Sequence, residues 1–230
     1  MNIAIALRYM EMGNPQGVWN VRWMCAEDYM HLAKKYGVGV VAVMSEAAIP
    51  QICAACDGLI IPGSATDIPP AYYNGAPLEK DPPVDEYALD SALTKYFFEA
   101  GKPIMGLCGG HQALNVFFGG SIRRMKDSKA HENDTEHKHA INIERGSFIY
   151  DVFGAERATV NSYHAWELDK IAPDLSVVAT TDDGVAEAIE WKKHHIFATQ
   201  WHPEISLRQE KAEEHVMFEN FLRRCEECRS

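Results

Sequence analysis

The sequence contains no apolar run long enough to span a lipid bilayer, no internal repeat and no segment of low complexity. It also lacks a stretch of proline, glycine and serine that would mark a linker, so its 230 residues are expected to form one domain. Basic residues are scarce, since 22 lysines and arginines face 33 aspartates and glutamates and give a net charge of −11. This negative charge argues against nucleic acids or anionic membranes as partners.

The first residues, Met-Asn-Ile-Ala-Ile-Ala-Leu-Arg, lack the basic region and apolar core of a secretory signal and predict a buried strand instead. The rest of the chain alternates between strand-like and helix-like patterns. The predicted strands are Asn2–Leu7, Val38–Val43, Gly58–Ile61, Pro103–Leu107, Ala158–Val160, Val177–Ala179, Val185–Ile189 and Ile196–Thr199. The predicted helices are Trp19–Tyr36, Asp85–Ala100, Gly110–Phe118 and Arg208–Arg223.

This alternation predicts an α/β fold, a three-layer, open, mostly parallel sheet with helices on both faces. Residues 140–200 are rich in strands with short turns and predict an antiparallel extension of the sheet. Residues 123–139 carry mixed charges and predict a surface lid or hairpin.

A candidate nucleophile lies in residues 106–112, which read Gly-Leu-Cys-Gly-Gly-His-Gln and connect an apolar strand to a helix. A nucleophile between small residues at such a junction is typical of a nucleophile elbow, whose sharp turn leaves the side chain exposed. Cys108 would also lie at a helix N-terminus, where backbone N–H groups and the helix dipole favour the thiolate. The alternative is a small buried apolar residue, as most free cysteines are. The flanking glycines favour the nucleophile.

A candidate proton shuttle, His202, follows an apolar strand in residues 196–204, Ile-Phe-Ala-Thr-Gln-Trp-His-Pro-Glu. His202 can accept the thiol proton and return it to a leaving amine, and Glu204 can orient the imidazole. The other histidines are weaker candidates because His194 and His195 lie in a turn that is expected to be solvated, and His131, His137 and His139 lie in the charged segment.

Donors for an oxyanion are expected where residues 57–64, Asp-Gly-Leu-Ile-Ile-Pro-Gly-Ser, run from a buried strand into a turn. The backbone N–H groups of Gly63 or Ser64 can point at the same carbonyl as that of Gly109. Taken alone, the segment is equally consistent with an ordinary turn at the end of a strand.

Six cysteines include two C-x-x-C pairs, Cys53 with Cys56 and Cys225 with Cys228, which have the spacing of zinc ligands. The two pairs are much further apart in the sequence than in a double C-x-x-C zinc motif. We therefore predict no metal site and no cofactor. A thiol nucleophile together with unpaired cysteines indicates a reducing compartment and thus the cytoplasm.

These motifs resemble a class I glutamine amidotransferase domain, and most closely the γ-glutamyl-GABA hydrolase type of peptidase family C26. Four further stretches carry the resemblance: Pro62–Pro69 with Tyr72 and Tyr73, Asp85–Asp90, Asn115–Gly120, and Val160–His164. Together they cover almost the whole chain and imply the flavodoxin-like fold of that superfamily.

The resemblance implies that Cys108 attacks a γ-glutamyl carbonyl, with His202 and Glu204 completing a triad and Gly63, Ser64 and Gly109 forming an oxyanion hole. Gln112 and the Ser162–Tyr163 backbone would hold the glutamyl amino and carboxylate groups, and His164 would line the leaving-group side. It further implies a small γ-glutamyl substrate, a role in polyamine catabolism and a possible homodimer.

Two departures from the family pattern leave the leaving amine open. The hydrolases usually have arginine after the nucleophile, where this chain has Gly109, and a Ser-x-His-His-Gln segment, where this chain has Ser162-Tyr-His-Ala-Trp166. Two other functions remain possible: an ammonia-donating glutaminase subunit of an amidotransferase complex, and a catalytically silent binding protein on the same fold.

Overall fold

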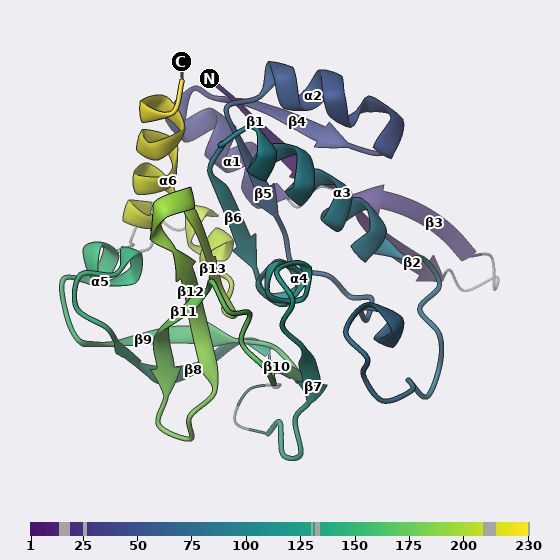
Figure 1. Ribbon diagram of the computed structural model, residues 1–230, viewed down its shortest axis with the longest axis vertical. Helices are drawn as coiled ribbons and strands as arrows, with labels where there is room; N and C mark the ends of the chain where they lie inside the picture. The colour runs from purple at the N-terminus through teal and green to yellow at the C-terminus, as the bar shows by residue number, and fades with distance from the viewer. Residues whose placement is uncertain (14–18, 25–26, 130, 132–133, 209–214, 230) are drawn as a thin grey trace.

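The computed structural model describes residues 1–13, 19–24, 27–129, 131, 134–208 and 215–229, and within them the main feature is a nine-stranded open sheet (Figure 1). Its strands in spatial order are β4 (Gly39–Val43), β1 (Asn2–Ala6), β5 (Gly58–Ile61), β6 (Ile104–Leu107), β13 (Ile196–Thr199), β12 (Ala186–Trp191), β11 (Ser176–Thr181), β8 (Asp134–Ile143) and β9 (Arg157–Ser162).

The sheet has a parallel and an antiparallel part that meet at β13. From β4 to β13 neighbouring strands run parallel, and from β13 to β9 they run antiparallel. Strands β5, β6 and β13 are buried along their whole length because helices cover both faces, which explains their unbroken apolar sequences. The expected open α/β sheet with an antiparallel extension is confirmed.

Helices cover the two faces of the sheet and complete three layers (Figure 1). On one face lie α2 (Ile49–Ala55), α3 (Glu86–Glu99) and α4 (Gly109–Phe117); on the other lie α1 (Glu27–Tyr36), α5 (Phe148–Phe153) and α6 (His215–Glu227). Leu93, Phe97 and Leu114 are fully buried in the first core. Phe218 and Phe221 are fully buried in the second.

Short 3-10 helices and two small two-stranded sheets complete the described structure. The 3-10 helices are η1 (Glu46–Ala48), η2 (Pro70–Tyr72), η3 (Lys192–His194) and η4 (Pro203–Arg208). One small sheet pairs β2 (Arg8–Gly13) with β3 (Trp19–Met24), and the other pairs β7 (Ile122–Arg124) with β10 (Trp166–Leu168). No helix in the described ranges is both long and apolar enough to cross a membrane.

Three sequence-based predictions need correction. The predicted helix Trp19–Tyr36 is wrong over its first part, because Trp19–Met24 is a strand and α1 begins only at Glu27. The sequence Trp-Asn-Val-Arg-Trp alternates with the period of a strand, which a helical interpretation overlooks. The segment 123–139 does not form a hairpin of its own, since β7 pairs with β10 and the chain enters the main sheet as β8 at Asp134. The last helix begins at His215 rather than at Arg208, and residues 209–214 lie outside the described residues.

The two C-x-x-C pairs do not come together in the fold. Cys53 and Cys56 lie at the end of α2 in one core, while Cys225 is fully buried in α6 in the opposite core. Cys225 is therefore a core residue of the last helix. Burial raises the pKa of the Cys56 thiol to about 11, so the thiol is poorly reactive.

Candidate active site

Cys108 occupies a strained turn between β6 and α4. Its φ of 50° and ψ of −103° place a non-glycine residue at positive φ, which costs on the order of 1–3 kcal/mol. The turn is possible only because small residues surround it: a Cβ on Gly106 would lie 2.6 Å from the carbonyl oxygen of Gly110, and a Cβ on Gly110 would collide with the carbonyl oxygen of Ile61. The backbone geometry is that expected of a nucleophile elbow, but the Cys108 side chain is buried rather than exposed as predicted.

The sulfur of Cys108 is held by a buried amide. Gln200, which is fully buried, donates from Nε2 to Sγ over 3.6 Å, and the thiol lies 3.9 Å from the carbonyl oxygen of Tyr163. Gln200 Oε1 accepts from Gln112 Nε2 at 3.1 Å and lies 3.2 Å from His111 Nδ1. Burial lowers the pKa of His111 to about 4, so the ring is neutral. These contacts orient the amide nitrogen of Gln200 toward sulfur, where it stabilises negative charge.

His202 and Glu204 lie next to this cysteine as an oriented pair. His202 Nδ1 lies 2.8 Å from Glu204 Oε1, and Asn161 holds the His202 backbone through two hydrogen bonds of 2.8 Å. A Cβ on Gly63 would lie 3.0 Å from Cε1 of His202 and 3.4 Å from Cβ of Cys108, so both side chains border the same small space.

The environment of His202 favours its charged form. Burial alone would lower the pKa of the imidazole, but negative charge on Cys108 and Glu204 raises the pKa well above its usual value.

The turn after β5 is fixed by a buried arginine that the sequence did not single out. Arg8 donates from Nε to the carbonyl oxygen of Gly63 at 3.0 Å and from Nη2 to that of Pro62 at 2.7 Å. Its Nη1 lies 2.8 Å from Asp90 Oδ1 of α3. Arg8 thus holds both carbonyl groups of this turn, and the backbone nitrogen of Ser64 lies 2.8 Å from where a Cβ on Gly109 would lie.

We expect Arg8→Met to destabilise the protein by about 3–5 kcal/mol, because it leaves Asp90 buried without its cation. Urea unfolding checks this value. Replacing both partners in Arg8→Met/Asp90→Leu should recover most of the loss, since an apolar pair of similar size removes the unpaired charge. Arg157→Met is the matched control, because its pair with Asp182 is exposed and such pairs contribute little to stability. Equal losses in Arg8→Met and Arg157→Met would contradict the expectation.

A cavity of about 520 Å³ opens beside Cys108, within the range typical of sites for small molecules. Most of the predicted site residues line it: Ser64, Cys108, Gly109, Gln112, Tyr163 and His164. Ser162 does not line it, since its side chain is fully buried and donates to the carbonyl oxygen of His131 at 3.1 Å. The amide nitrogen of Gln112 also lies 3.5 Å from the carbonyl oxygen of Trp166, so its contact with substrate stays a prediction.

A buried carboxylate, that of Glu187, lies beside His164. Glu187 Oε1 lies 3.4 Å from His164 Nε2, and Glu187 Oε2 lies 3.5 Å from His139 Nε2. Burial alone would raise the pKa of Glu187, but contacts with His139 and His164 lower it to about 2. Sequence reasoning missed this group because it assigned His139 to a charged surface segment.

Comparison with known proteins identifies the family. The sequence profile of the Peptidase C26 family matches residues 3–204. The chain belongs to the peptidase C26 family. Similar proteins include YvdE of Lactococcus lactis, which is named provisionally as a glutamine amidotransferase-like protein. The two sequences are 34% identical over 72% of each chain. Similar proteins also include the γ-glutamyl-γ-aminobutyrate hydrolase PuuD of Escherichia coli K12, at 29% identity over 80% of this chain and 78% of PuuD.

Among solved structures, a protein of Thermoplasma acidophilum that is provisionally named as part of a GMP synthase superposes on this C26 protein with a TM-score of 0.69. The alignment covers 100% of this chain and 96% of the other at 19% identity, so the likeness concerns the fold. The predicted membership of the class I glutamine amidotransferase-like proteins and their flavodoxin-like fold is confirmed, and the protein is a hydrolase of the C26 type.

Proposed function

We propose that this C26 protein is a cysteine-dependent hydrolase of γ-glutamyl amides, which releases glutamate and an amine through a γ-glutamyl thioester. One observation carries the proposal: Cys108, at a positive-φ elbow on a cavity of about 520 Å³, lies beside the oriented His202–Glu204 pair. Relatives that carry the name of a γ-glutamyl-γ-aminobutyrate hydrolase support the substrate class.

In the first half-reaction the Cys108 thiolate attacks the γ-carbonyl carbon and forms the carbon–sulfur bond. The carbon–nitrogen bond then breaks, and His202 gives its Nε2 proton to the departing amine. Glu204 accepts a hydrogen bond from Nδ1–H and keeps the ring in the orientation that leaves Nε2 available.

In the second half-reaction water replaces the amine. Neutral His202 takes a proton from the water as its oxygen attacks the thioester carbon, the carbon–sulfur bond breaks, and glutamate leaves. Cys108 is regenerated as thiolate beside protonated His202. The amide nitrogen of Gln200 stabilises the sulfur anion at both ends of the cycle.

The developing oxyanion needs hydrogen-bond donors on the face of the carbonyl opposite His202. We assign this role to the backbone N–H groups of Gly109 and Ser64. Support comes from their proximity and from the hold of Arg8 on the carbonyl oxygens of Pro62 and Gly63. Such pre-oriented donors each contribute about 10²–10³ in rate. Gly63 keeps the turn close enough to His202 and Cys108 to act on the same carbonyl.

The leaving amine is expected to extend into an adjoining cavity of about 460 Å³, which shares Asp67 and Trp166 with the first. Lys80, Arg123 and Arg124 line this second cavity. Three basic side chains line this cavity together with two acidic ones, Asp67 and Glu79, and we therefore expect amines that carry a carboxylate, such as GABA, to be preferred over polyamines.

Glutamate release from a panel of γ-glutamyl amides tests this function: glutamine, γ-glutamyl-GABA, γ-glutamyl-putrescine and a γ-glutamyl dipeptide. We expect turnover of γ-glutamyl-GABA and the dipeptide to exceed that of γ-glutamyl-putrescine. Arg124→Ala should lower kcat/KM about tenfold for γ-glutamyl-GABA, in line with the loss of one charged contact, and leave glutamine unchanged. Arg145→Ala, in another part of the surface, is the matched control.

Other outcomes favour the alternatives. Slow hydrolysis of glutamine alone would favour an ammonia-donating subunit that needs a synthase partner, a possibility supported by relatives with glutamine amidotransferase names. A binding protein would be favoured if no compound is turned over and if a thiol-reactive γ-glutamyl analogue fails to label Cys108.

A further inference from the structure

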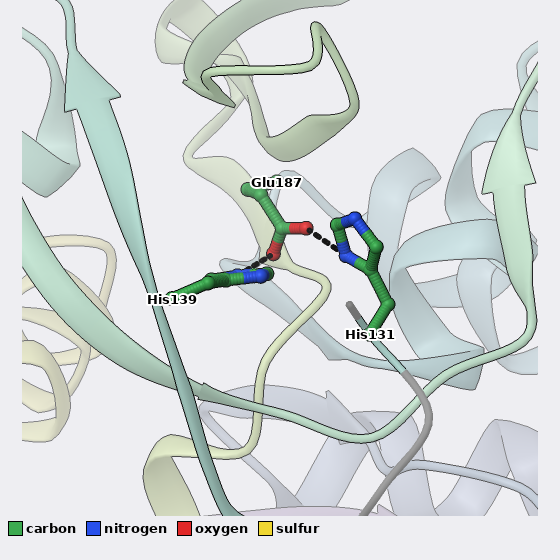
Figure 2. A group of neighbouring side chains, drawn as sticks. All are labelled: His131, His139 and Glu187. Carbon is green, nitrogen blue, oxygen red and sulfur yellow. Dashed lines mark ion pairs between the residues drawn. The ribbon is translucent and has the colours of Figure 1, made fainter. Parts of the chain in front are cut away.

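Three histidines surround the carboxylate of Glu187 next to the cavity wall. Figure 2 shows His131 and His139 approaching the two oxygens of Glu187 from different directions. His131 Nδ1 lies 3.7 Å from Oε1, His139 Nε2 lies 3.5 Å from Oε2, and His164 Nε2 lies 3.4 Å from Oε1. One donor atom each from His131, His139 and Glu187 lie within 4.8 Å of one another.

The group is buried, and its inner atoms lack partners. The side chains of His131, His164 and Glu187 are at most 1% exposed, and that of His139 is 12% exposed. Among the described residues, no hydrogen bond of ordinary geometry reaches either Glu187 oxygen, His131 Nδ1, His164 Nε2 or either nitrogen of His139. Buried polar atoms are normally satisfied, so this many orphaned atoms around one point calls for a ligand.

Outer contacts fix which ring nitrogens face the carboxylate. His131 Nε2 lies 3.1 Å from Asp183 Oδ2, and His164 Nδ1 lies 2.9 Å from the carbonyl oxygen of Trp166. Both outer nitrogens face acceptors and so carry hydrogen. When such a ring carries no second proton, its inner nitrogen presents a lone pair. Lone pairs aimed at the anionic oxygens of Glu187 repel unless a cation lies between them.

We propose that His131 Nδ1, His139 Nε2, His164 Nε2 and the Glu187 carboxylate bind one divalent transition-metal ion of the zinc class. Imidazole and carboxylate are donors that Zn²⁺ accepts in tetrahedral sites. Bonds of about 2.0–2.1 Å in such a site separate neighbouring donor atoms by about 3.3 Å. The nitrogen–oxygen separations, two to Oε1 and one to Oε2 of Glu187, are close to this value at 3.4–3.7 Å. Asp183 then forms the carboxylate–histidine–metal arrangement typical of such sites.

The metal would join segments that are distant in sequence at the wall of the active site. The carbonyl oxygen of His131 accepts from Ser162 Oγ at 3.1 Å and from His164 N at 2.8 Å. The same loop contains Tyr163, whose carbonyl oxygen lies next to the Cys108 sulfur. With four protein donors the site is closed, so its role is structural: it positions this loop rather than activating water.

Metal content measured in a Cys108→Ala background tests the proposal, because zinc bound by the nucleophile is then not counted. The protein is incubated with excess Zn²⁺, dialysed and analysed by elemental mass spectrometry. We expect about one bound Zn²⁺ that is lost on adding Glu187→Gln or His139→Asn, and retained with His31→Gln as control. Asp183→Asn keeps all four donors, and we expect it to weaken Zn²⁺ affinity about 10–100-fold in a competition with a chromophoric chelator.

A second readout identifies the donors. Co²⁺ in place of Zn²⁺ should give the intense visible absorption of a tetrahedral site, absent in the Glu187→Gln protein. The proposal would be overturned if Glu187→Gln and His139→Asn leave the zinc content unchanged, or if the Cys108→Ala protein binds no Zn²⁺. In that case protons alone would balance the charge of Glu187. Because the Asp183 side chain is 56% exposed, Asp183→Asn provides a test even if the buried variants fail to fold.

Discussion

Cys108→Ala should abolish γ-glutamyl hydrolysis, with a loss in kcat of at least about 10⁴-fold. The sulfur forms and breaks the covalent bond to substrate in both half-reactions, and no neighbouring group in the described site can replace it: Gln200 is an amide and Ser64 Oγ is held by Thr66 and Glu86. Removal of a nucleophile of this kind can cost about a millionfold in other enzymes. Glutamate release in single-turnover and steady-state assays measures the loss.

Cys53→Ala is the matched control, because Cys53 is also a buried free cysteine but belongs to α2 and packs in the core. It should keep full activity, whereas Cys108→Ala should keep the far-UV and near-UV circular dichroism of the parent protein. Mass spectrometry of acid-quenched parent protein should also detect a γ-glutamyl adduct on the peptide that contains Cys108. Activity within tenfold of the parent in Cys108→Ala would exclude the thioester mechanism.

The residues nearest the proposed chemistry could be predicted from sequence because their signals are local. Cys108 is flanked by glycines at a strand–helix junction, and Glu204 follows His202 by two residues at the end of a strand. Strands β6 and β13 are parallel neighbours, so their carboxyl ends lie at the same edge of the sheet. The residues that follow each strand therefore begin at that edge. The structure brings these three side chains together for that reason.

Residues that support the site could not be predicted in the same way. Arg8, Asn161 and Gln200 act through contacts with residues 41 to 92 positions away in the sequence. Gln200 could have been singled out, since it lies in the Gln-Trp-His-Pro-Glu motif, but only the structure shows that its amide lies next to the Cys108 sulfur. Arg8 looked like the polar end of the first strand.

The fold shows the same division between local and long-range information. The buried strands β5 and β13 match their predicted bounds because a short apolar run with polar ends is typical of a strand that is buried on both faces. Strand β3 was predicted as a helix because the short alternation of its own sequence was overlooked, and its pairing with β2 shows that it is a strand. The histidines of β8 and the preceding turn looked exposed for a related reason, since the glutamate that they contact lies on β12.

His202→Asn should lower kcat by about 10²–10⁴-fold, the usual contribution of a general acid–base. Asparagine preserves the backbone hydrogen bonds with Asn161 but cannot exchange a proton with the amine or with water. The pH profile gives an independent check. The raised pKa of His202 means that the imidazolium persists above the usual titration range of histidine and is lost as the pH rises through that value. Hydrolysis by the parent protein should therefore decline on the alkaline side, and this limb should vanish in His202→Asn.

Glu204→Gln separates orientation from proton transfer. Glutamine still reaches Nδ1 of His202, but it removes one of the two negative charges that raise the pKa of the imidazole. The alkaline limb should then move to lower pH while activity at its optimum falls less than in His202→Asn. An alkaline limb at the same pH in parent and Glu204→Gln proteins would contradict this assignment, because the titrating group would then lie elsewhere. His194→Asn, at an aromatic surface turn, should change neither the rate nor the limb.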